Sequence, residues 1–327
     1  MSTNLLLVSP YSMSFYGGVQ NQLGLIKKYL PEDDFNVKYL CPDSPDFNLG
    51  KSMKISFNGA IAPIRLFVNK SILKEATTWA DIVHLHEPFI PMIFWRLPIN
   101  KKTIITHHAS LSKVIGLIQK MFIKSEIYAH TVTAVSAEAS KNTLNKVKVK
   151  IIANAIESKD ARSSFNPAKE LLFIGRDERR KNFQLYERLS KKLNNDEYTY
   201  RAITNKKKIL SNIILYVNPN DKEKEDILEK SSIYLAVNTH GESFGITIIE
   251  AVNSGCVAIC SDINAFKDLM EDSGVYFKNN NLESLKKIIE ELLSGDINII
   301  YAIQKKHIEK YFINKVMPSW ISLYAQI

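Results

Sequence analysis

The sequence is poor in cysteine and has no long apolar run. Three cysteines in 327 residues, Cys41, Cys256 and Cys260, are too few for a disulfide framework, and no cysteine–histidine spacing matches a zinc site. Cys256 and Cys260 stand four positions apart in an apolar run, which predicts a strand with both thiols on one buried face. No run of about 18 apolar residues occurs, so the sequence predicts no membrane-spanning helix.

The N-terminal residues carry no basic leader. Residues 1–10 contain an apolar stretch that is too short for the central region of a signal peptide, and they predict a first β-strand instead. The low cysteine content also suits a reducing compartment. We therefore expect a cytoplasmic protein, whose contact with a membrane would be peripheral and on the inner face.

Basic residues outnumber acidic ones. Lys and Arg total 43 against 34 Asp and Glu, which gives a formal net charge of +9. Such a surplus favours an anionic partner, and phosphorylated ligands, anionic lipid and nucleic acid all meet that description. No nucleic-acid-binding module is recognisable, so we expect no nucleic-acid partner.

Length and alternation predict two domains of the same class. A chain of 327 residues exceeds the roughly 250–300 residues that one hydrophobic core supports. Short apolar runs alternate with amphipathic stretches such as Gln20–Tyr29 and Phe183–Lys192, which is typical of parallel sheets flanked by helices. The predicted strands are Asn4–Val8, Val37–Cys41, Ile82–His86, Thr103–Thr106, Thr131–Val135, Lys150–Ile152, Leu171–Ile174, Tyr198–Ile203, Ile213–Tyr216, Ile233–Val237 and Val257–Cys260.

A polar stretch separates the two halves. Ser158–Lys169 is irregular, contains paired serines and a proline, and is flanked by strand patterns. We therefore predict an N-terminal domain over residues 1–157 and a C-terminal domain over residues 158–310. Ligands of parallel sheets bind beyond the carboxyl ends of the strands, so two facing sheets predict a cleft lined by the loops that follow them.

In the first half, the loops that follow strands carry glycines and histidines. Gly17 and Gly18 precede a helix, where the backbone can approach a ligand and amides can face a phosphate, although a plain tight turn explains the pair equally well. His84 alternates with apolar neighbours and suits the core. His108 stands beyond the next strand, where it can hydrogen-bond a hydroxyl or sugar oxygen.

In the second half, these loops carry charged side chains. Arg176 and Lys181 follow a buried strand, where cations can neutralise a departing diphosphate. Glu242 lies in the predicted loop, and Glu250, eight positions later (250 − 242), would lie about two turns into the following helix, which can place both carboxylates toward one ligand. The amides of Ser243–Gly245 would then form a helix N-terminus that suits a phosphate.

Taken in order, these loops resemble the family-4 group of retaining glycosyltransferases, whose double-Rossmann architecture is called GT-B. Within that group they are most similar to those of phosphatidylinositol mannosyltransferases. The likeness extends across nearly the whole chain, and the glutamate pair in its loop is its most specific part. The matching stretches are Gly17–Gln20, His84–Pro88, His107–Ser110, Val132–Ser136, Gly175-Arg176 with Lys181, Asn238–Glu250 and Ser261–Phe266.

The resemblance implies a role for each matching residue. Arg176 and Lys181 would hold the donor diphosphate, Glu250 the ribose and Glu242 the transferred sugar, while His108 would lie beside the reacting centre. His108, Glu242, Arg176 and Lys181 are thus the implied catalytic residues. The other implied donor-binding residues are Gly17, Gly18, Ser243, Phe244, Gly245 and Ile246, and the implied acceptor-binding residues are Gln20 and Asn58.

The resemblance also implies the reaction. It would move a hexose, with retention at the anomeric carbon, from GDP-mannose to a membrane-associated lipid such as phosphatidylinositol. The nucleotide sugar would be a co-substrate, and no bound cofactor is expected. No Asp-x-Asp metal motif occurs, so basic residues and helix dipoles would replace a metal ion.

Two other functions stay open. One is the same chemistry with a UDP-sugar and a soluble or polysaccharide acceptor, because all such donors share the diphosphate and ribose that the motifs contact. The other is a catalytically silent scaffold that binds nucleotide sugars, which the shortened second domain suggests and the intact motifs disfavour. The region Lys70–Lys74 carries only two lysines where membrane-active relatives have a strongly basic helix, which weakens the case for lipid docking.

The end of the chain has the pattern of an amphipathic helix. Residues 311–327 carry Trp320, Leu323 and Tyr324 at helical spacing. The resemblance implies that this helix packs back on the N-terminal domain.

Overall fold

The structure is a computed structural model, and the chain in it divides into two compact units. Met1–Ala155 together with Ile313–Ile327 form the first unit, and Ile156–Phe312 form the second. Most of the predicted linker, Ser158–Lys169, lies outside the described residues. The structure describes residues 2–14, 17–57, 60–65, 68–88, 97–109, 124–141, 143–144, 146–159, 169–193 and 197–327.

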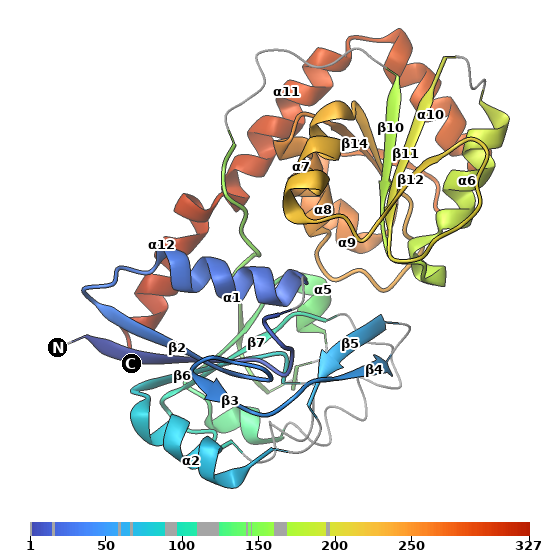
Figure 1. Cartoon of the computed structure of the whole chain (residues 1–327). Helices are drawn as coiled ribbons and strands as arrows, with labels where there is room; N and C mark the ends of the chain where they lie inside the picture. The colour runs from blue at the N-terminus through green and yellow to red at the C-terminus, as the bar shows by residue number, and fades with distance from the viewer. Residues whose placement is uncertain are drawn as a thin grey trace. The chain divides into compact units, whose positions relative to one another are not determined.

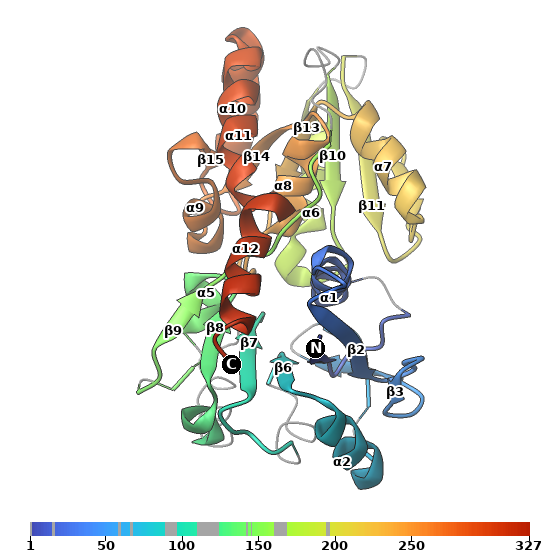
Figure 2. The ribbon, with the colours of Figure 1, turned by 90° about the vertical axis from the view of Figure 1, so that its left-hand side faces the viewer.

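The described residues of the first unit form a seven-stranded sheet in the order β3-β2-β1-β6-β7-β8-β9. Every neighbouring pair in it is parallel, as the sequence predicts. Figure 2 shows β3 and β9 at its two edges. The strands are β1 (Thr3–Val8), β2 (Phe35–Cys41), β3 (Phe47–Asn48), β6 (Ile82–His86), β7 (Thr103–His107), β8 (Thr131–Ala134) and β9 (Val149–Ile151).

Alternation along β1 explains why both faces of this sheet are covered. Leu5 and Leu7 point to one side and pack with α1 (Gly18–Tyr29) and α12 (Ile313–Tyr324). Leu6 and Val8 point to the other side, in a second cluster that includes residues of α2 (Lys70–Trp79). Figure 1 shows α1 and α12 on one face and α2 on the other. A continuous apolar run is therefore the pattern of a strand buried on both faces.

The first unit also holds elements that the sequence analysis did not predict. β4 (Met53–Phe57) and β5 (Ala60–Ile64) pair antiparallel in a separate two-stranded sheet. A 3₁₀ turn, η1 (Lys124–Tyr128), precedes β8, and the short α5 (Ala137–Ser140) follows it.

The second unit contains a six-stranded sheet, again parallel, in the order β12-β11-β10-β13-β14-β15. The edge strand β15 was not predicted. The strands are β10 (Glu170–Ile174), β11 (Thr199–Thr204), β12 (Ile214–Val217), β13 (Ile233–Ala236), β14 (Val257–Ser261) and β15 (Val275–Phe277). The helices are α6 (Phe183–Lys192), α7 (Asp221–Lys230), α8 (Ile246–Asn253), α9 (Asn264–Met270), α10 (Leu282–Ser294) and α11 (Ile297–Ile308), with 3₁₀ turns η2 (Arg179–Lys181), η3 (Glu271–Ser273) and η4 (Glu309–Tyr311).

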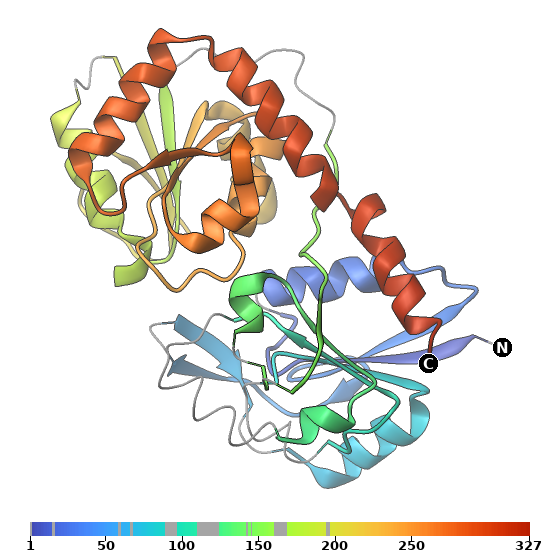
Figure 3. The same ribbon diagram turned by 180° about the vertical axis from the view of Figure 1, so that it is seen from behind.

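Helices cover both faces of this sheet as well. Residues of α6 and α10 join one face in an apolar cluster, and α8 and α11 contact β14. The fully buried Gln304 of α11 accepts a hydrogen bond from the Ala258 amide at 2.8 Å and donates one to the Ala258 carbonyl at 2.9 Å. Figure 3 shows α10 and α11 as two helices that meet at a bend along the outside of the unit. Cys256 and Cys260 are fully buried, which confirms that they belong to the core.

No helix in the described ranges is both long and apolar enough to span a bilayer.

The last helix completes the core of the first unit. In α12, Trp320 lies with its ring centroid 4.9 Å from that of His84 and 6.0 Å from that of Tyr324. The Tyr324 hydroxyl is 2.7 Å from His84 Nδ1. All three side chains are at most 5% exposed, so residues from the C-terminal segment pack directly on β6.

Replacing Trp320 by alanine should therefore destabilise the first unit. We expect the free energy of unfolding to fall by about 3–5 kcal/mol, because the substitution leaves a cavity beside His84. Urea unfolding followed by the fluorescence of the remaining tryptophans reports this unit, since the second unit contains no tryptophan. Ser322→Ala, at an exposed position of the same helix, should stay within about 0.5 kcal/mol of the wild type. Equal midpoints for the two variants would contradict this packing.

Candidate functional site

The strand order of the second sheet indicates where a ligand should bind. The chain runs outward from β10 through β11 to β12, then returns to place β13 on the other side of β10. Sheets of this kind bind ligands beyond the carboxyl ends of the two strands at such a switch point. The loops that follow β10 and β13 carry Arg176, Lys181 and Glu242, three of the predicted site residues.

The loop after β10 makes a tight exit from the sheet. A Cβ atom at Gly175 would lie 2.7 Å from Phe173 Cζ, so this position has no room for a side chain unless that ring moves. The chain then forms η2, and Asn182 adopts a left-handed conformation (φ 57°) as the residue before α6. Lys181 is thereby presented at the carboxyl edge of the sheet.

The loop after β13 ends at the start of α8. Gly245, the N-cap, has φ 95°, and a Cβ there would approach Phe266 and Leu269 to 3.1 Å. α8 begins only at Ile246, so Glu250 stands about one turn into the helix. The prediction that Glu250 lies about two turns into the helix is therefore wrong, because the loop that carries Glu242 continues to Gly245 before the helix starts.

Lys181 and Glu242 join the two loops through an ion pair. Lys181 Nζ lies 2.7 Å from Glu242 Oε2, and both side chains are about one-sixth exposed. Asn238 Nδ2 donates to the same carboxylate oxygen, also at 2.7 Å. Burial raises the pKa of Glu242, but the nearby charges of Lys181 and Arg180 outweigh it, so the net pKa is lowered. Glu242 is thus held as a carboxylate at the loop.

Glu250 pairs with a different lysine. Lys224 of α7 lies 2.8 Å from Glu250 Oε2, and both side chains are about 15% exposed. Lys224 was not among the predicted site residues, since no spacing in the sequence relates α7 to α8. Asn238 begins a matching stretch but was given no role, although its position just beyond a predicted strand could have suggested one.

Arginines supply the other positive charges. Arg180 Nη1 donates to the Gly241 carbonyl at 2.8 Å, and the Thr239 amide donates to the Arg180 carbonyl at 2.8 Å, so this residue also ties the two loops. Arg176 is 43% exposed and lies 3.9 Å from Glu178. The structure therefore joins Lys181 to Glu242 at the carboxyl ends of β10 and β13, and it places Arg176 in the loop that also carries Lys181.

In the first unit, the switch point lies between β1 and β6. Gly17 is the N-cap of α1, with an extended backbone, and Gly18 is its first residue. A Cβ at Gly18 would meet nothing within 4 Å, so packing inside this unit does not require glycine there. Gln20 Nε2 donates to the Ser12 carbonyl at 3.2 Å. Asn58, the other predicted acceptor residue, lies outside the described residues.

Histidines gather where β6 and β7 end. His84 hydrogen-bonds Tyr324 and Thr106, both at 2.7 Å, which confirms its place in the core. His86 Nδ1 lies 2.9 Å from His108 Nε2, and both rings are buried. Burial is the main cause that lowers the pKa of His108 to about 3 and the pKa values of His84 and His86 well below their usual range.

A buried carboxylic acid accompanies these rings. Glu87 is 3% exposed, has a left-handed backbone (φ 56°) and is hydrogen-bonded by the backbone amides of Ala109 and His108. Burial raises its pKa to about 7, although His107 and the two amides oppose that rise. Next to it, His107 Nε2 lies 2.5 Å from Glu126 Oε1.

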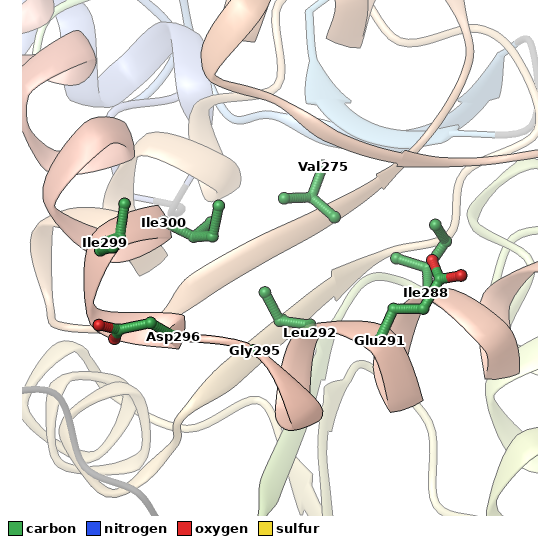
Figure 4. A pocket seen from close by; sticks show the side chains of 8 residues that line it. All are labelled: Val275, Ile288, Glu291, Leu292, Gly295, Asp296, Ile299 and Ile300. Carbon is green, nitrogen blue, oxygen red and sulfur yellow. The ribbon is translucent and has the colours of Figure 1, made fainter.

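The second unit also contains a cavity that none of the predicted site residues line. An apolar cavity of about 410 Å³ lies between α10, α11 and the amino-terminal end of β15 (Figure 4). Its only charged lining residues are acidic, which disfavours a diphosphate. It is lined by Val275, Ile288, Glu291, Leu292, Gly295, Asp296, Ile299 and Ile300. Within the described residues, no cluster of three or more His, Cys, Asp or Glu side chains could hold a metal ion.

Comparisons with known proteins relate the chain to glycosyltransferases. Residues 155–311 match the family model described as "Glycosyl transferases group 1", a range that contains both loops of the switch point. Two phosphatidyl-myo-inositol mannosyltransferases are 26% identical to the chain: that of Propionibacterium freudenreichii subsp. shermanii, over 98% of this chain and 94% of that protein, and that of Mycobacterium leprae, over 82% and 81%. The GDP-mannose:cellobiosyl-diphosphopolyprenol alpha-mannosyltransferase of Komagataeibacter xylinus is 22% identical over 76% and 72%. The predicted resemblance is confirmed.

Solved structures agree on the fold. A glycosyltransferase from Rickettsia africae superposes with a TM-score of 0.69 at 18% identity, over 99% of this chain and 98% of that one. The Anabaena protein HepE, solved in complex with UDP and glucose, has a TM-score of 0.74 at 12% identity, over 99% and 100%. The sucrose-phosphate synthase of Thermosynechococcus elongatus gives 0.74 at 12%, over 99% and 98%. The GT-B fold predicted from the sequence is confirmed.

The raised pKa of Glu87 gives the protein a pH-dependent stability. The pKa of Glu87 is about 7 in the folded state and 4.5 ordinarily, so the folded state binds this proton more tightly than the unfolded state does. Protonated Glu87 therefore adds to the free energy of unfolding fully below pH 4.5, and this contribution is lost as pH rises through 7. Glu87→Gln stays neutral throughout. We expect the melting temperature of the variant, relative to the wild type, to be higher at pH 8 than at pH 5. Equal differences at the two pH values, measured by calorimetry, would mean that Glu87 titrates in its ordinary range.

Proposed function

We propose that this chain, a glycosyltransferase whose residues 155–311 form a glycosyl transferases group 1 domain, moves a hexose from a nucleotide sugar to a lipid. We propose GDP-mannose as the donor and a membrane-associated lipid such as phosphatidylinositol as the acceptor, with peripheral contact between protein and membrane. The products would be the mannosylated lipid and GDP.

The observation that carries the proposal is the pair of loops at the carboxyl ends of β10 and β13. They combine the Lys181–Glu242 ion pair with the start of α8, at the switch point of a parallel sheet. Cations and helix amides together suit a diphosphate, and a carboxylate suits sugar hydroxyls. The curated relatives support the choice of sugar and acceptor, because their names specify mannosyl transfer to phosphatidyl-myo-inositol or to a diphosphopolyprenol.

In the proposed complex each donor group meets a side chain of matching chemistry. Arg176 and Lys181 bind the two phosphates, and Glu250 accepts hydrogen bonds from the ribose hydroxyls. Glu242 accepts hydrogen bonds from the mannose. To do so it keeps one oxygen for the sugar while the other stays bonded to Lys181 and Asn238. The amides of residues 243–246 would face a phosphate or the sugar.

We propose that transfer occurs with retention. The acceptor hydroxyl oxygen forms a bond to the anomeric carbon on the face from which the diphosphate departs. The bond from that carbon to the phosphate oxygen breaks, and its electron pair leaves with GDP. The hydroxyl proton passes to an oxygen of the departing phosphate. Lys181, Arg176 and the amides at the start of α8 stabilise the negative charge that develops there.

The roles implied for the first unit stay predictions. These are contact with the donor diphosphate at Gly17 and Gly18, acceptor binding at Gln20 and Asn58, and a position of His108 beside the reacting centre.

A donor screen tests the proposal directly. The protein is incubated with GDP-mannose, UDP-glucose or UDP-N-acetylglucosamine and with phosphatidylinositol vesicles, and lipid mass and released nucleotide are measured. We expect the lipid to gain the mass of one mannosyl residue only with GDP-mannose. Glu242→Ala should lower the rate of this transfer at least about 100-fold. Nucleotide release without a lipid product would point to another acceptor, and turnover of UDP-glucose alone would overturn the donor assignment. No turnover of any donor would favour the silent scaffold.

Binding of the nucleotide should depend on Lys181. Lys181→Met keeps the length of the side chain and removes its charge, so GDP should bind about 10–100-fold more weakly, as measured by titration calorimetry. Lys191→Met is a matched control, because Lys191 lies on the neighbouring α6 in an exposed pair with Glu187. We expect GDP to bind that variant as it binds the wild type. Equal GDP affinities for the two variants would show that Lys181 does not bind the diphosphate.

A further inference from the structure

The contact between His86 and His108 involves two histidines from adjacent strands. His86 is the last residue of β6, and His108 follows the last residue of β7. Their ring centroids are 5.2 Å apart with the planes inclined by 30°, and His86 Nδ1 is 2.9 Å from His108 Nε2. Since a hydrogen bond needs one donor and one acceptor, only one of these two nitrogens carries the proton.

The other nitrogen of His86 decides the direction of this bond. His86 Nε2 is buried and has no hydrogen-bond partner among the described residues. A neutral imidazole has one N–H and one bare nitrogen, and both rings are neutral because burial lowers their pKa values. Leaving a bare nitrogen unpaired costs less than burying an unpaired N–H, since orphaned buried donors are rarer than under-satisfied acceptors. His86 therefore carries its proton on Nδ1 and donates it to His108 Nε2.

The surroundings hold His86 in this orientation. The His84 ring lies against it with centroids 3.9 Å apart. His84 is itself fixed by Tyr324 and by Thr106, and the Thr106 hydroxyl is 2.6 Å from that of Thr133. The His86 ring thus packs on a histidine that is itself held in place by a chain of buried hydrogen bonds across β6, β7 and β8.

The backbone of His108 is fixed from the same strand end. Glu87 follows His86 directly, and its carboxyl group is hydrogen-bonded by the backbone amides of His108 and Ala109. His86 and Glu87, consecutive residues at the end of β6, therefore hold the ring and the main chain of His108, respectively. A hydrogen bond to one ring nitrogen selects the tautomer of the other.

We propose that His86 is a positioning residue that holds His108 in the tautomer with its proton on Nδ1, so that His108 offers a neutral N–H donor. The effect of His86 on turnover rests on the proposed function, whereas the assignment of the His108 tautomer does not.

The assignment narrows what His108 does in the proposed reaction. Its Nε2 already accepts a hydrogen bond, and Nδ1 carries a proton, so neither nitrogen is free to take the proton of an acceptor hydroxyl. His108 instead donates to an oxygen of the sugar or the acceptor. The acceptor proton must then leave by another route, which agrees with its transfer to the departing phosphate.

Nuclear magnetic resonance of the full chain, labelled with ¹⁵N-histidine, reads the tautomer without any need for activity. The signals of His108 are assigned as those lost in His108→Gln. We expect the Nδ1–H pattern for His108 in the wild type and a mixture of tautomers in His86→Leu, where the donor is gone. An Nε2–H pattern or a mixture in the wild type would overturn the proposal, as would a pure Nδ1–H pattern that persists in His86→Leu.

Turnover provides the second readout. His86→Leu should lower kcat about 10–100-fold, less than the removal of a direct catalytic contact often does, and should leave GDP affinity unchanged. His86→Asn, whose amide can donate from the position of Nδ1, should recover most of this loss. Thr103→Val is the control, since it removes a buried hydroxyl of the same strand, β7, that accepts from the Asn100 amide and lies outside the chain of hydrogen bonds behind His86. We expect its kcat to equal that of the wild type.

The outcomes separate the two proposals. Equal kcat for His86→Leu and the wild type would exclude a positioning role. If the wild type shows the Nδ1–H tautomer but transfers no hexose, the proposed function fails and the His86–His108 assignment stands. If His86→Leu does not fold, the wild-type spectrum and the kcat of His86→Asn still decide the matter.

Discussion

The Lys181–Glu242 ion pair is the interaction on which the candidate site depends. It joins the loop after β10 to the loop after β13, two segments about 60 residues apart in sequence, at the point where the strand order reverses. Each partner is mostly buried, so neither charge would be tolerable alone. Asn238 and Arg180 reinforce the junction through further hydrogen bonds. A cationic and an anionic group are therefore held side by side at the carboxyl ends of β10 and β13, which is the arrangement that the proposed donor complex uses.

Much of the fold follows from the sequence, because the apolar runs that form buried parallel strands are unambiguous. β6 begins and ends where the pattern predicts, and the interior strands of both sheets differ only at their termini. The edge strands β3 and β15 and the antiparallel β4–β5 pair were missed, since short or partly exposed strands carry little apolar signal. The same limit applies at α8: the sequence does not mark where its helix begins, so the geometry between Glu242 and Glu250 was misjudged.

The residues of the candidate site also include some whose positions were predictable from the sequence and some whose positions were not. The position of Arg176 and Lys181 in a loop at the carboxyl edge of the sheet was predictable, because topology brings the ends of parallel strands to one edge. Partners supplied by other helices were not, as Lys224 shows, because tertiary packing alone brings α7 against α8. The tautomer of His108 is likewise beyond sequence reasoning. It depends on the orphaned nitrogen of His86, which only coordinates reveal.

The first unit combines two segments that are far apart in the sequence, which has a consequence for its folding during synthesis. Its core contains Trp320 and Tyr324 of α12, whereas the second unit is a single continuous segment, Ile156–Phe312. On the ribosome, the second unit is therefore complete before the first has all its parts. Until α12 emerges, Leu5, Leu7 and the other residues that it covers stay partly exposed, and a nascent chain in that state depends on protection from aggregation.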